Sequence, residues 1–231
     1  PLDYETVTEY KLTVRAQNKD LLFATVEIIV EVEDVNDEIP YFIEILKGSI
    51  VENNDIGAPA MTVRAIDKDG TSPNNLVEYE LITYNDLFSI NKATGEIKAK
   101  ATFDREQEKI YHVLVQARDS APSALFRDKN KTNSANQTFP ISIEDQNDNQ
   151  PKFEHSLYTV FNISETADVQ KDVVEVKARD SDTASLIKYS IIEGNIDDAF
   201  NIEEITGRIK VNKKLDFEKI ESYELTVRAY D

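Results

Sequence analysis

Three short stretches of the chain share one pattern of apolar and polar residues. In residues 10–16, 111–117 and 223–229, every second side chain is apolar. This is the period of a β-strand that packs one face on a core and exposes the other to water. A further strand is predicted at 24–33, after the first copy. Because each copy runs from tyrosine to alanine in the same register, the chain is predicted to repeat one structural unit.

Additional short strands are predicted between these copies, in the same order each time. Turn segments at 91–95 and 204–207, both ending in Thr-Gly, separate neighbouring strands at hairpin spacing. The additional strands are residues 61–65, 77–82, 88–91 and 97–101 in one copy, and 173–178, 187–192, 200–202 and 208–211 in the next. About seven strands in roughly 110 residues, without a long amphipathic helical pattern, predict an all-β chain of tandem seven-stranded Greek-key β-sandwiches.

Two polar segments that end in proline, 34–40 and 145–151, are predicted to connect the repeats. Proline has no N–H group to donate to a β-ladder, and a run of amide and carboxylate side chains cannot form a buried strand. The predicted parts are the C-terminal part of one repeat at 1–38, a complete repeat at 39–149, and most of a third repeat at 150–231.

Acidic residues recur at equivalent positions of successive repeats. Asp37 and Asp148 are 111 residues apart, Glu52 and Glu165 are 113 apart, and the pairs Asp104 with Asp216 and Asp119 with Asp231 are each 112 apart. Asp-x-Asp pairs occur at 67/69 and 180/182, and Asp-x-Glu pairs at 3/5, 104/106 and 216/218. A single pair of this kind is usually solvated surface charge. Recurrence of the whole set at one period favours shared cation sites instead.

The chemistry of these side chains favours a hard cation. Residues two apart in an extended segment point the same way, so each pair can contribute to one site. Calcium takes about six to eight oxygen ligands from carboxylates, amides and carbonyls. The spacing of an EF-hand loop is absent, because Asp67-Lys68-Asp69-Gly70 breaks its register.

Composition narrows the classes of partner. The chain contains 44 acidic and 26 basic residues, and its net charge of −18 disfavours nucleic acids and anionic membrane surfaces. It has no cysteine, so a disulfide framework and thiolate metal sites are excluded. No apolar run reaches the roughly 20 residues of a membrane-spanning helix, and no signal-peptide pattern opens the sequence.

Together these motifs resemble the tandem extracellular repeats of the cadherin superfamily. The matching elements are the two Asp-x-Asn-Asp linkers, the glutamates Glu52 and Glu165, the segment Asp104-Arg105-Glu106, the Asp-x-Asp pairs, and the Ala-x-Asp endings at Asp119 and Asp231. They extend over essentially the whole chain. The resemblance implies immunoglobulin-like repeats from the interior of a larger cadherin or protocadherin-like ectodomain, with three calcium ions (Ca2+) at each junction.

The resemblance also implies the calcium ligands. At the first junction they would be Asp3, Glu5, Val35 (carbonyl), Asn36, Asp37, Glu38 (carbonyl), Asp67, Asp69 and Asp119. At the second junction they would be Glu52, Asp104, Glu106, Gln146 (carbonyl), Asn147, Asp148, Asn149 (carbonyl), Asp180, Asp182 and Asp231. Glu38 stands where the family has asparagine. Since that position resembles a carbonyl donor, the change of side chain is expected to leave the site intact.

The middle repeat carries an insertion before its last strand. Asp119 and Asp145 are 26 residues apart, whereas the first repeat has only 16 between Asn18 and Asp34. The segment 120–136 is therefore predicted to be an exposed, mobile surface loop. Glycosylation sequons occur at Asn130, Asn136 and Asn162, two of them in this segment, which fits an extracellular surface.

Catalytic residue sets are not recognisable in the sequence. His112 alternates away from its apolar neighbours and is predicted to be exposed, and His155 is an isolated loop residue. A Ser-His-Asp set and a phosphate-binding glycine loop are both missing. Asp104 and Glu106 are disfavoured as a glycosidase pair, because such pairs flank a cleft. We expect that the chain is not an enzyme.

The resemblance implies a module for calcium-dependent cell adhesion or cell-surface protein interaction, in which calcium at the junctions rigidifies the ectodomain. The partner would be another cadherin ectodomain, homophilic or heterophilic, with no nucleic acid and no membrane contact by these repeats. The location would be the extracellular side of the plasma membrane, on a single-pass membrane protein. The alternative is a set of spacer repeats in a secreted or surface enzyme whose catalytic unit lies elsewhere.

Overall fold

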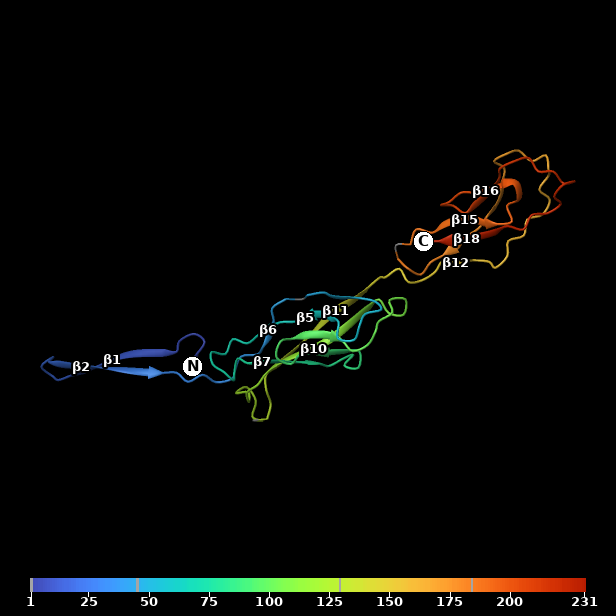
Figure 1. Ribbon diagram of the computed structural model, residues 1–231. Helices are drawn as coiled ribbons and strands as arrows, with labels where there is room; N and C mark the ends of the chain where they lie inside the picture. Colours follow the sequence, from blue (N-terminus) through green and yellow to red (C-terminus); the bar gives the residue numbers. More distant parts are fainter. Residues whose placement is uncertain (1, 45, 129, 184) are drawn as a thin grey trace. The chain divides into compact units, whose positions relative to one another are not determined.

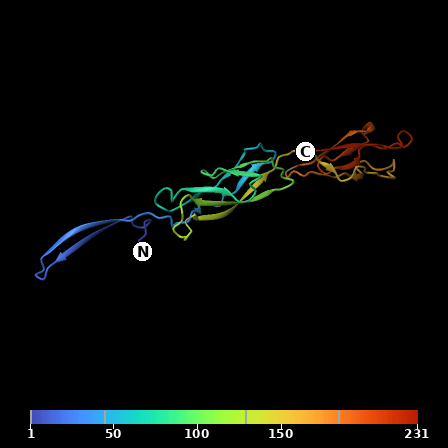
Figure 2. The same cartoon turned by 90° about the horizontal axis from the view of Figure 1, so that it is seen from below.

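The computed structural model describes residues 2–44, 46–128, 130–183 and 185–231, drawn in two views in Figures 1 and 2. The chain divides into two compact units, Pro1–Glu144 and Asp145–Asp231. The strands of the first unit are β1 (Glu9–Gln17), β2 (Phe23–Glu31), β3 (Tyr41–Phe42), β4 (Gly48–Val51), β5 (Pro59–Thr62), β6 (Ala65–Ile66), β7 (Val77–Leu81), β8 (Phe88–Ile90), β9 (Glu96–Ala99), β10 (Ile110–Asp119) and β11 (Ser134–Glu144). The second unit contains β12 (Lys152–Phe153), β13 (Asp172–Glu175), β14 (Ala178–Arg179), β15 (Lys188–Glu193), the short 3-10 helix η1 (Ile196–Asp198), β16 (Phe200–Ile202), β17 (Arg208–Val211) and β18 (Thr226–Tyr230).

The strands β1 and β2 form an antiparallel hairpin near the start of the chain. Tyr10 lies opposite Val30, and Ala16 lies opposite Ala24. Strands were predicted at 10–16 and 24–33, and the structure confirms them. The predicted packing of one face of 10–16 on a core was wrong, because β1 pairs only with β2 among the described strands and most side chains of both strands are exposed.

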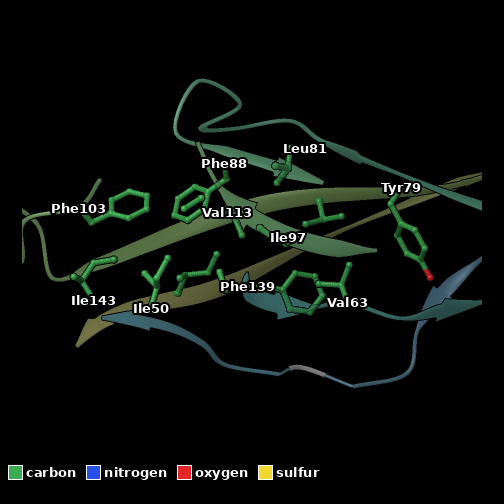
Figure 3. Packing of buried hydrophobic residues seen from close by; sticks show 14 of the residues in the cluster. Ile50, Val63, Tyr79, Leu81, Phe88, Ile97, Phe103, Val113, Phe139 and Ile143 are labelled. Atoms are coloured by element: carbon green, nitrogen blue, oxygen red, sulfur yellow. The ribbon is translucent and has the colours of Figure 1, made fainter. Parts of the chain in front are cut away.

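The middle repeat is a β-sandwich. One sheet has the strand order β4-β11-β10-β7 and the other has the order β5-β9-β8. In the first sheet β4 and β11 run parallel, whereas the remaining neighbours are antiparallel. The core lies between the two sheets, where Phe88, Ile97, Val113 and Phe139 are each 0% exposed (Figure 3). Such tight burial of large apolar side chains is the main source of stability of this unit.

Alternation in β10 places its side chains as the sequence predicts. Val113, Val115 and Ala117 are buried in the core, whereas His112 is exposed. The period of two therefore places one face of β10 on the core, and Asp119 at the end of the strand lies on that same face.

One glycine turn shows why the repeats share a Thr-Gly motif. Gly95 has a φ of +72°, and a Cβ atom there would lie 2.3 Å from the carbonyl oxygen of Val63. Gly207 repeats this arrangement with a φ of +69° and 2.3 Å to the oxygen of Val176. Glycine is required because any side chain would both strain the backbone and collide with the facing carbonyl oxygen.

The second unit repeats the architecture with its own core. Its sheets have the orders β13-β17-β16, β15-β18 and β12-β14. Val176, Tyr189, Phe200 and Ile209 are buried among the described core residues. The Tyr189 hydroxyl accepts a hydrogen bond from the Ala178 N–H at 2.9 Å.

A matching tyrosine bond occurs in the middle repeat, where the Tyr79 hydroxyl accepts from the Ala65 N–H at 2.7 Å. The predicted all-β fold of tandem β-sandwich repeats is thus confirmed. The predicted strand at 61–65 is divided, however, because β5 pairs with β9 and β6 pairs with β3. No helix in the described part of the chain is long and apolar enough to cross a membrane.

Candidate metal centres at the two linkers

The first linker begins with Asp34, whose carboxylate is held by the segment that follows β6. Its Oδ2 accepts hydrogen bonds from the Thr71 N–H at 2.8 Å and the Asn74 Nδ2 at 3.1 Å, and also from the Thr71 hydroxyl. These donors lower the pKa of Asp34, although burial opposes them. Its Oδ1 is buried without a hydrogen-bond partner. Asp34 was missing from the predicted ligands, although its counterpart Asp145 opens the second linker and the repetition could have identified both.

Asp69 lies beside the linker and is only 3% exposed. Its Oδ1 accepts a hydrogen bond from the Glu38 N–H at 3.1 Å, while its Oδ2 is buried without a partner. Burial raises the pKa of Asp69 to about 6, and the charges of Asp67 and Asp34 add to the shift. Carboxylate oxygens of Glu5, Asp34 and Asp69 lie within 4.8 Å of one another. The fold therefore holds like charges together at this linker.

Asp67 and Asp69 form a tight turn instead of an extended segment. The Asp67 Oδ1 accepts a hydrogen bond from the Asp69 N–H at 2.9 Å, and the Asp67 Oδ2 is buried without a partner. The charge of Asp67 adds to the raised pKa of Asp69, so the two carboxylates lie near each other. A side chain-to-backbone bond places them, instead of strand alternation, and their sharing of one cation site stays a prediction.

Asp119 ends β10 and is 1% exposed. Both of its oxygens accept the Asn133 N–H at 3.2 Å. Burial raises the pKa of Asp119, and the charge of Asp67 raises it further. Asn36, in the linker, is 4% exposed and donates from its Nδ2 to the Ala121 carbonyl at 2.8 Å. Its Oδ1 accepts a hydrogen bond from the Asn133 Nδ2 at 2.6 Å.

The remaining predicted ligands of the first junction lie at its exposed side. Glu5 is exposed overall, but partial desolvation of its carboxylate raises its pKa, and the charges of Asp34 and Asp37 raise it further. Asp3 accepts hydrogen bonds from the Thr6 N–H at 3.0 Å and the Thr6 hydroxyl at 2.9 Å, so its carboxylate caps its own turn. Val35 and Asp37 are exposed.

The middle repeat carries three predicted ligands of the second junction. Glu52 is 2% exposed and accepts a hydrogen bond from the Arg105 N–H at 2.8 Å. Asp104 caps its own turn by accepting from the Gln107 N–H at 3.2 Å and its Nε2 at 2.7 Å. Glu106 is exposed. In the third repeat Glu165 accepts from the Phe217 N–H at 3.0 Å, as Glu52 does from Arg105.

The second linker repeats the hydrogen bonds of the first within its own unit. The Asp182 Oδ2 accepts from the Asp148 N–H at 3.1 Å and the Asn149 N–H at 3.0 Å. The Asp180 Oδ1 accepts from the Asp182 N–H at 2.9 Å, and the Asp180 Oδ2 is buried without a partner. Asp145 accepts from the Thr183 N–H at 2.7 Å, as Asp34 does from Thr71.

Within that unit the structure brings three predicted ligands together. Oxygens of Asp180, Asp182 and Asp231 lie within 4.8 Å of one another. Asp182 is 7% exposed, whereas Asp231 is exposed. Gln146 and Asn147 are exposed in the linker.

The donor set fits a hard divalent cation. Among the residues that the structure describes, four carboxylate oxygens at the linkers are buried without a hydrogen-bond partner: Asp34 Oδ1, Asp67 Oδ2, Asp69 Oδ2 and Asp180 Oδ2. An unpaired buried carboxylate oxygen is strongly unfavourable unless a positive charge faces it. Because the side chains are carboxylates and amides and the chain has no cysteine, the chemistry favours calcium over a thiophilic metal.

The insertion differs from its prediction. Ala121 is 4% exposed, and Ser123 and Asn133 are each 1% exposed, so the segment 120–136 is buried at three positions near its two ends. The prediction of an exposed surface loop was wrong at these positions, because Ala121 and Asn133 hydrogen-bond to Asn36 of the first linker. Residues 124–128 are exposed. The sequon residues Asn130, Asn136 and Asn162 are also exposed, and their glycosylation stays a prediction.

Comparison with known proteins identifies the family. A family model of the cadherin domain matches residues 46–144 and 159–231. Over its whole length the chain is 42% identical to Neural-cadherin of Drosophila melanogaster and 33% identical to Protocadherin Fat 4 of Homo sapiens, of which it spans 8% and 5%. The solved extracellular domain of Protocadherin GammaB4 is 27% identical with a TM-score of 0.81, covering 99% of this chain and 38% of that chain. Mouse Cadherin-23 EC22-24 is 26% identical with a TM-score of 0.73, covering 99% and 71%. The chain, with its tandem β-sandwiches and its acidic linkers, belongs to the cadherin family.

Proposed function

We propose that this chain is a calcium-dependent adhesion module in which calcium at the linkers between repeats rigidifies an ectodomain. The observation that carries the proposal is the convergence of buried, unpaired carboxylate oxygens at the first linker, where Asp34, Asp67 and Asp69 each leave one oxygen without a donor. The repeated hydrogen bonds of Asp180 and Asp182 support the same role for the second linker. The ligand sets predicted from the sequence for both junctions are part of this proposal.

Electrostatics explains why the linkers would depend on a cation. Two unit charges about 4 Å apart repel by about 4 kcal/mol at the effective dielectric constant of a protein surface. Each bound calcium ion supplies two positive charges to such a group of carboxylates. Because calcium would bind the ordered linker and not a disordered one, it stabilises the ordered state by mass action. Asp34 and Asp69, which the fold already holds in place, would then be neutralised without further rearrangement.

The partner that we propose is another cadherin ectodomain. Similarity to cadherins and protocadherins, which includes a structure titled as a protocadherin gammaB7 cis-dimer, supports this choice. We place the repeats on the extracellular side of the plasma membrane, in a single-pass membrane protein. The exposed sequons and the acidic surface agree with that location. We propose no enzymatic role, since the named relatives are cadherins.

Calorimetric titration with calcium tests the ligand assignment. Asp69→Asn should remove or weaken binding, because it replaces a buried carboxylate of the first linker. The matched control is Asp86→Asn, which removes the same charge from an exposed position of the middle repeat and should leave binding unchanged. Equal binding by both variants would refute the assignment. Aggregation of beads coated with the protein, measured with calcium and with a chelator, tests adhesion. Aggregation that is equal in the two conditions would contradict the proposed function.

A further inference from the structure

The inserted segment of the middle repeat closes over the first linker. The Ser123 N–H donates to the Lys131 carbonyl at 2.8 Å, which closes the segment into a loop. The Ala124 N–H then donates to the Asn36 carbonyl at 2.7 Å, and the Asn36 Nδ2 donates to the Ala121 carbonyl at 2.8 Å. The insertion is thus hydrogen-bonded to the first linker at Asn36.

Asn133, the residue before β11, hydrogen-bonds to the linker through its side chain. It is 1% exposed. Its Nδ2 donates to the Asn36 Oδ1 at 2.6 Å and to the Glu38 carbonyl at 2.7 Å. Its backbone N–H faces both oxygens of Asp119 at 3.2 Å. The side-chain nitrogen of Asn133 therefore bonds two oxygens of the linker, and its backbone N–H bonds the carboxylate at the end of β10.

The orientation of the Asn133 amide follows from these neighbours. With Nδ2 inward, both of its hydrogens find acceptors, and only the Asn133 Oδ1 is buried without a partner. The reversed amide would place Oδ1 against the Asn36 Oδ1 and the Glu38 carbonyl, which are acceptors only at those atoms. The amide nitrogen therefore points at the linker.

The acceptors of Asn133 are the same atoms that the ligand assignment gives to a cation. Asn36 contributes its side-chain oxygen and Glu38 its carbonyl, and Asp119 lies beside them. We propose that Asn133 stands in for a cation at the first linker: its amide nitrogen holds the linker oxygens together when calcium is absent and releases them when calcium binds. This inference rests on the proposed function, because it concerns the calcium site of the first junction.

The proposal has two consequences that a merely structural asparagine would not have. Asn133 stabilises the calcium-free linker through two hydrogen bonds that the calcium-bound linker no longer contains. By linkage, an interaction made only in the free state lowers the affinity for the ligand. Removing the amide should therefore loosen the calcium-free linker and at the same time tighten calcium binding.

The test is the variant Asn133→Leu, which has a similar volume and no donor. Amide hydrogen exchange of Glu38 and Ala124 in chelator should become faster than in the wild-type chain. The calcium dissociation constant, taken from the shift of the Glu38 amide in an NMR titration, should fall about tenfold, as expected for the net loss of one or two hydrogen bonds from the free state. The matched control is Asn136→Leu in β11, whose exposed side chain accepts a hydrogen bond from the Gln116 Nε2 on β10.

Two other results for the dissociation constant would overturn the inference. An unchanged dissociation constant for Asn133→Leu would show that Asn133 supports both states equally. A weaker affinity would show that Asn133 is itself a calcium ligand. If the variant unfolds, Asn133→Ala replaces it, because alanine removes the donor without adding a charge or a new ligand, and this variant should have a less stable calcium-free state and tighter calcium binding. If the wild-type chain shows no calcium-dependent shift at Glu38, the proposed function itself fails at this junction.

Discussion

Replacement of Asp69 by asparagine should stabilise the calcium-free protein and destabilise the calcium-bound protein. Asp69 is 3% exposed, and burial raises its pKa from 3.8 to about 6, with the charges of Asp67 and Asp34 adding to the shift. Between these two pH values the folded chain holds a proton that the unfolded chain has lost. Its free energy of unfolding therefore falls as the pH rises from about 4 to about 6.

The size of the effect follows from the shift. About two pKa units correspond to roughly 3 kcal/mol of unfavourable free energy once Asp69 is ionised in the folded state. Asparagine removes this charge, and its amide oxygen can still accept the Glu38 N–H that Asp69 binds at 3.1 Å. Its amide nitrogen would face the oxygens of Glu5 and Asp34, which lie within 4.8 Å of the Asp69 carboxylate. In chelator at pH 7.5 the variant should be more stable by up to about 3 kcal/mol, and the gain should vanish below about pH 4.

Calcium should reverse the sign. The wild-type chain gains stability from calcium by mass action, whereas the variant has lost a carboxylate ligand and gains less. Urea denaturation followed by circular dichroism, at two pH values and with calcium or chelator, measures all four free energies. Asp86→Asn, at an exposed site, should follow the wild type throughout. A variant that is less stable than wild type in chelator, or whose advantage is the same at pH 4 and pH 7.5, would refute the electrostatic reasoning.

Three further predictions concern the backbone, the second linker and the insertion. Gly95→Ala should lower the free energy of unfolding in urea denaturation by at least about 1 kcal/mol, because its Cβ would lie 2.3 Å from a carbonyl oxygen. Gly57→Ala, where no atom lies within 4 Å of the added Cβ, should lower it less, and equal losses would contradict the collision. In calorimetric titration, Asp148→Ala should severely reduce the calcium affinity, because it removes a carboxylate ligand. Gln146→Ala should leave the affinity nearly unchanged, because the backbone carbonyl that serves as the ligand remains. Equal losses would reject the proposed ligand roles. Limited trypsin digestion in calcium should first cut within 127–131, whose described residues are exposed; first cleavage in a linker would show that the weakest segment lies elsewhere.

Local sequence patterns determined the strands and the repeats of this protein. The alternation from Tyr111 to Ala117 is a property of neighbouring residues, and it placed Val113 and Val115 in the core without knowledge of the partner strands. The Thr-Gly turns were equally readable, because the backbone at Gly95 allows only glycine. The resemblance supplied carboxylates at both linkers, and the structure brings some of them together, such as Asp180, Asp182 and Asp231.

Tertiary structure alone decided how the insertion meets the first linker. Asn133 and Asn36 are 97 residues apart, and nothing local to either one predicts that their side chains bond. The insertion is polar and looks like a solvated loop in the sequence, yet Asn133 is buried, because Asp119 at the end of β10 accepts its N–H and the linker oxygens of Asn36 and Glu38 accept its Nδ2. A periodic pattern records which face of a strand is buried. It does not record which distant polar group will satisfy a buried acceptor, because that depends on where the fold brings the two segments together.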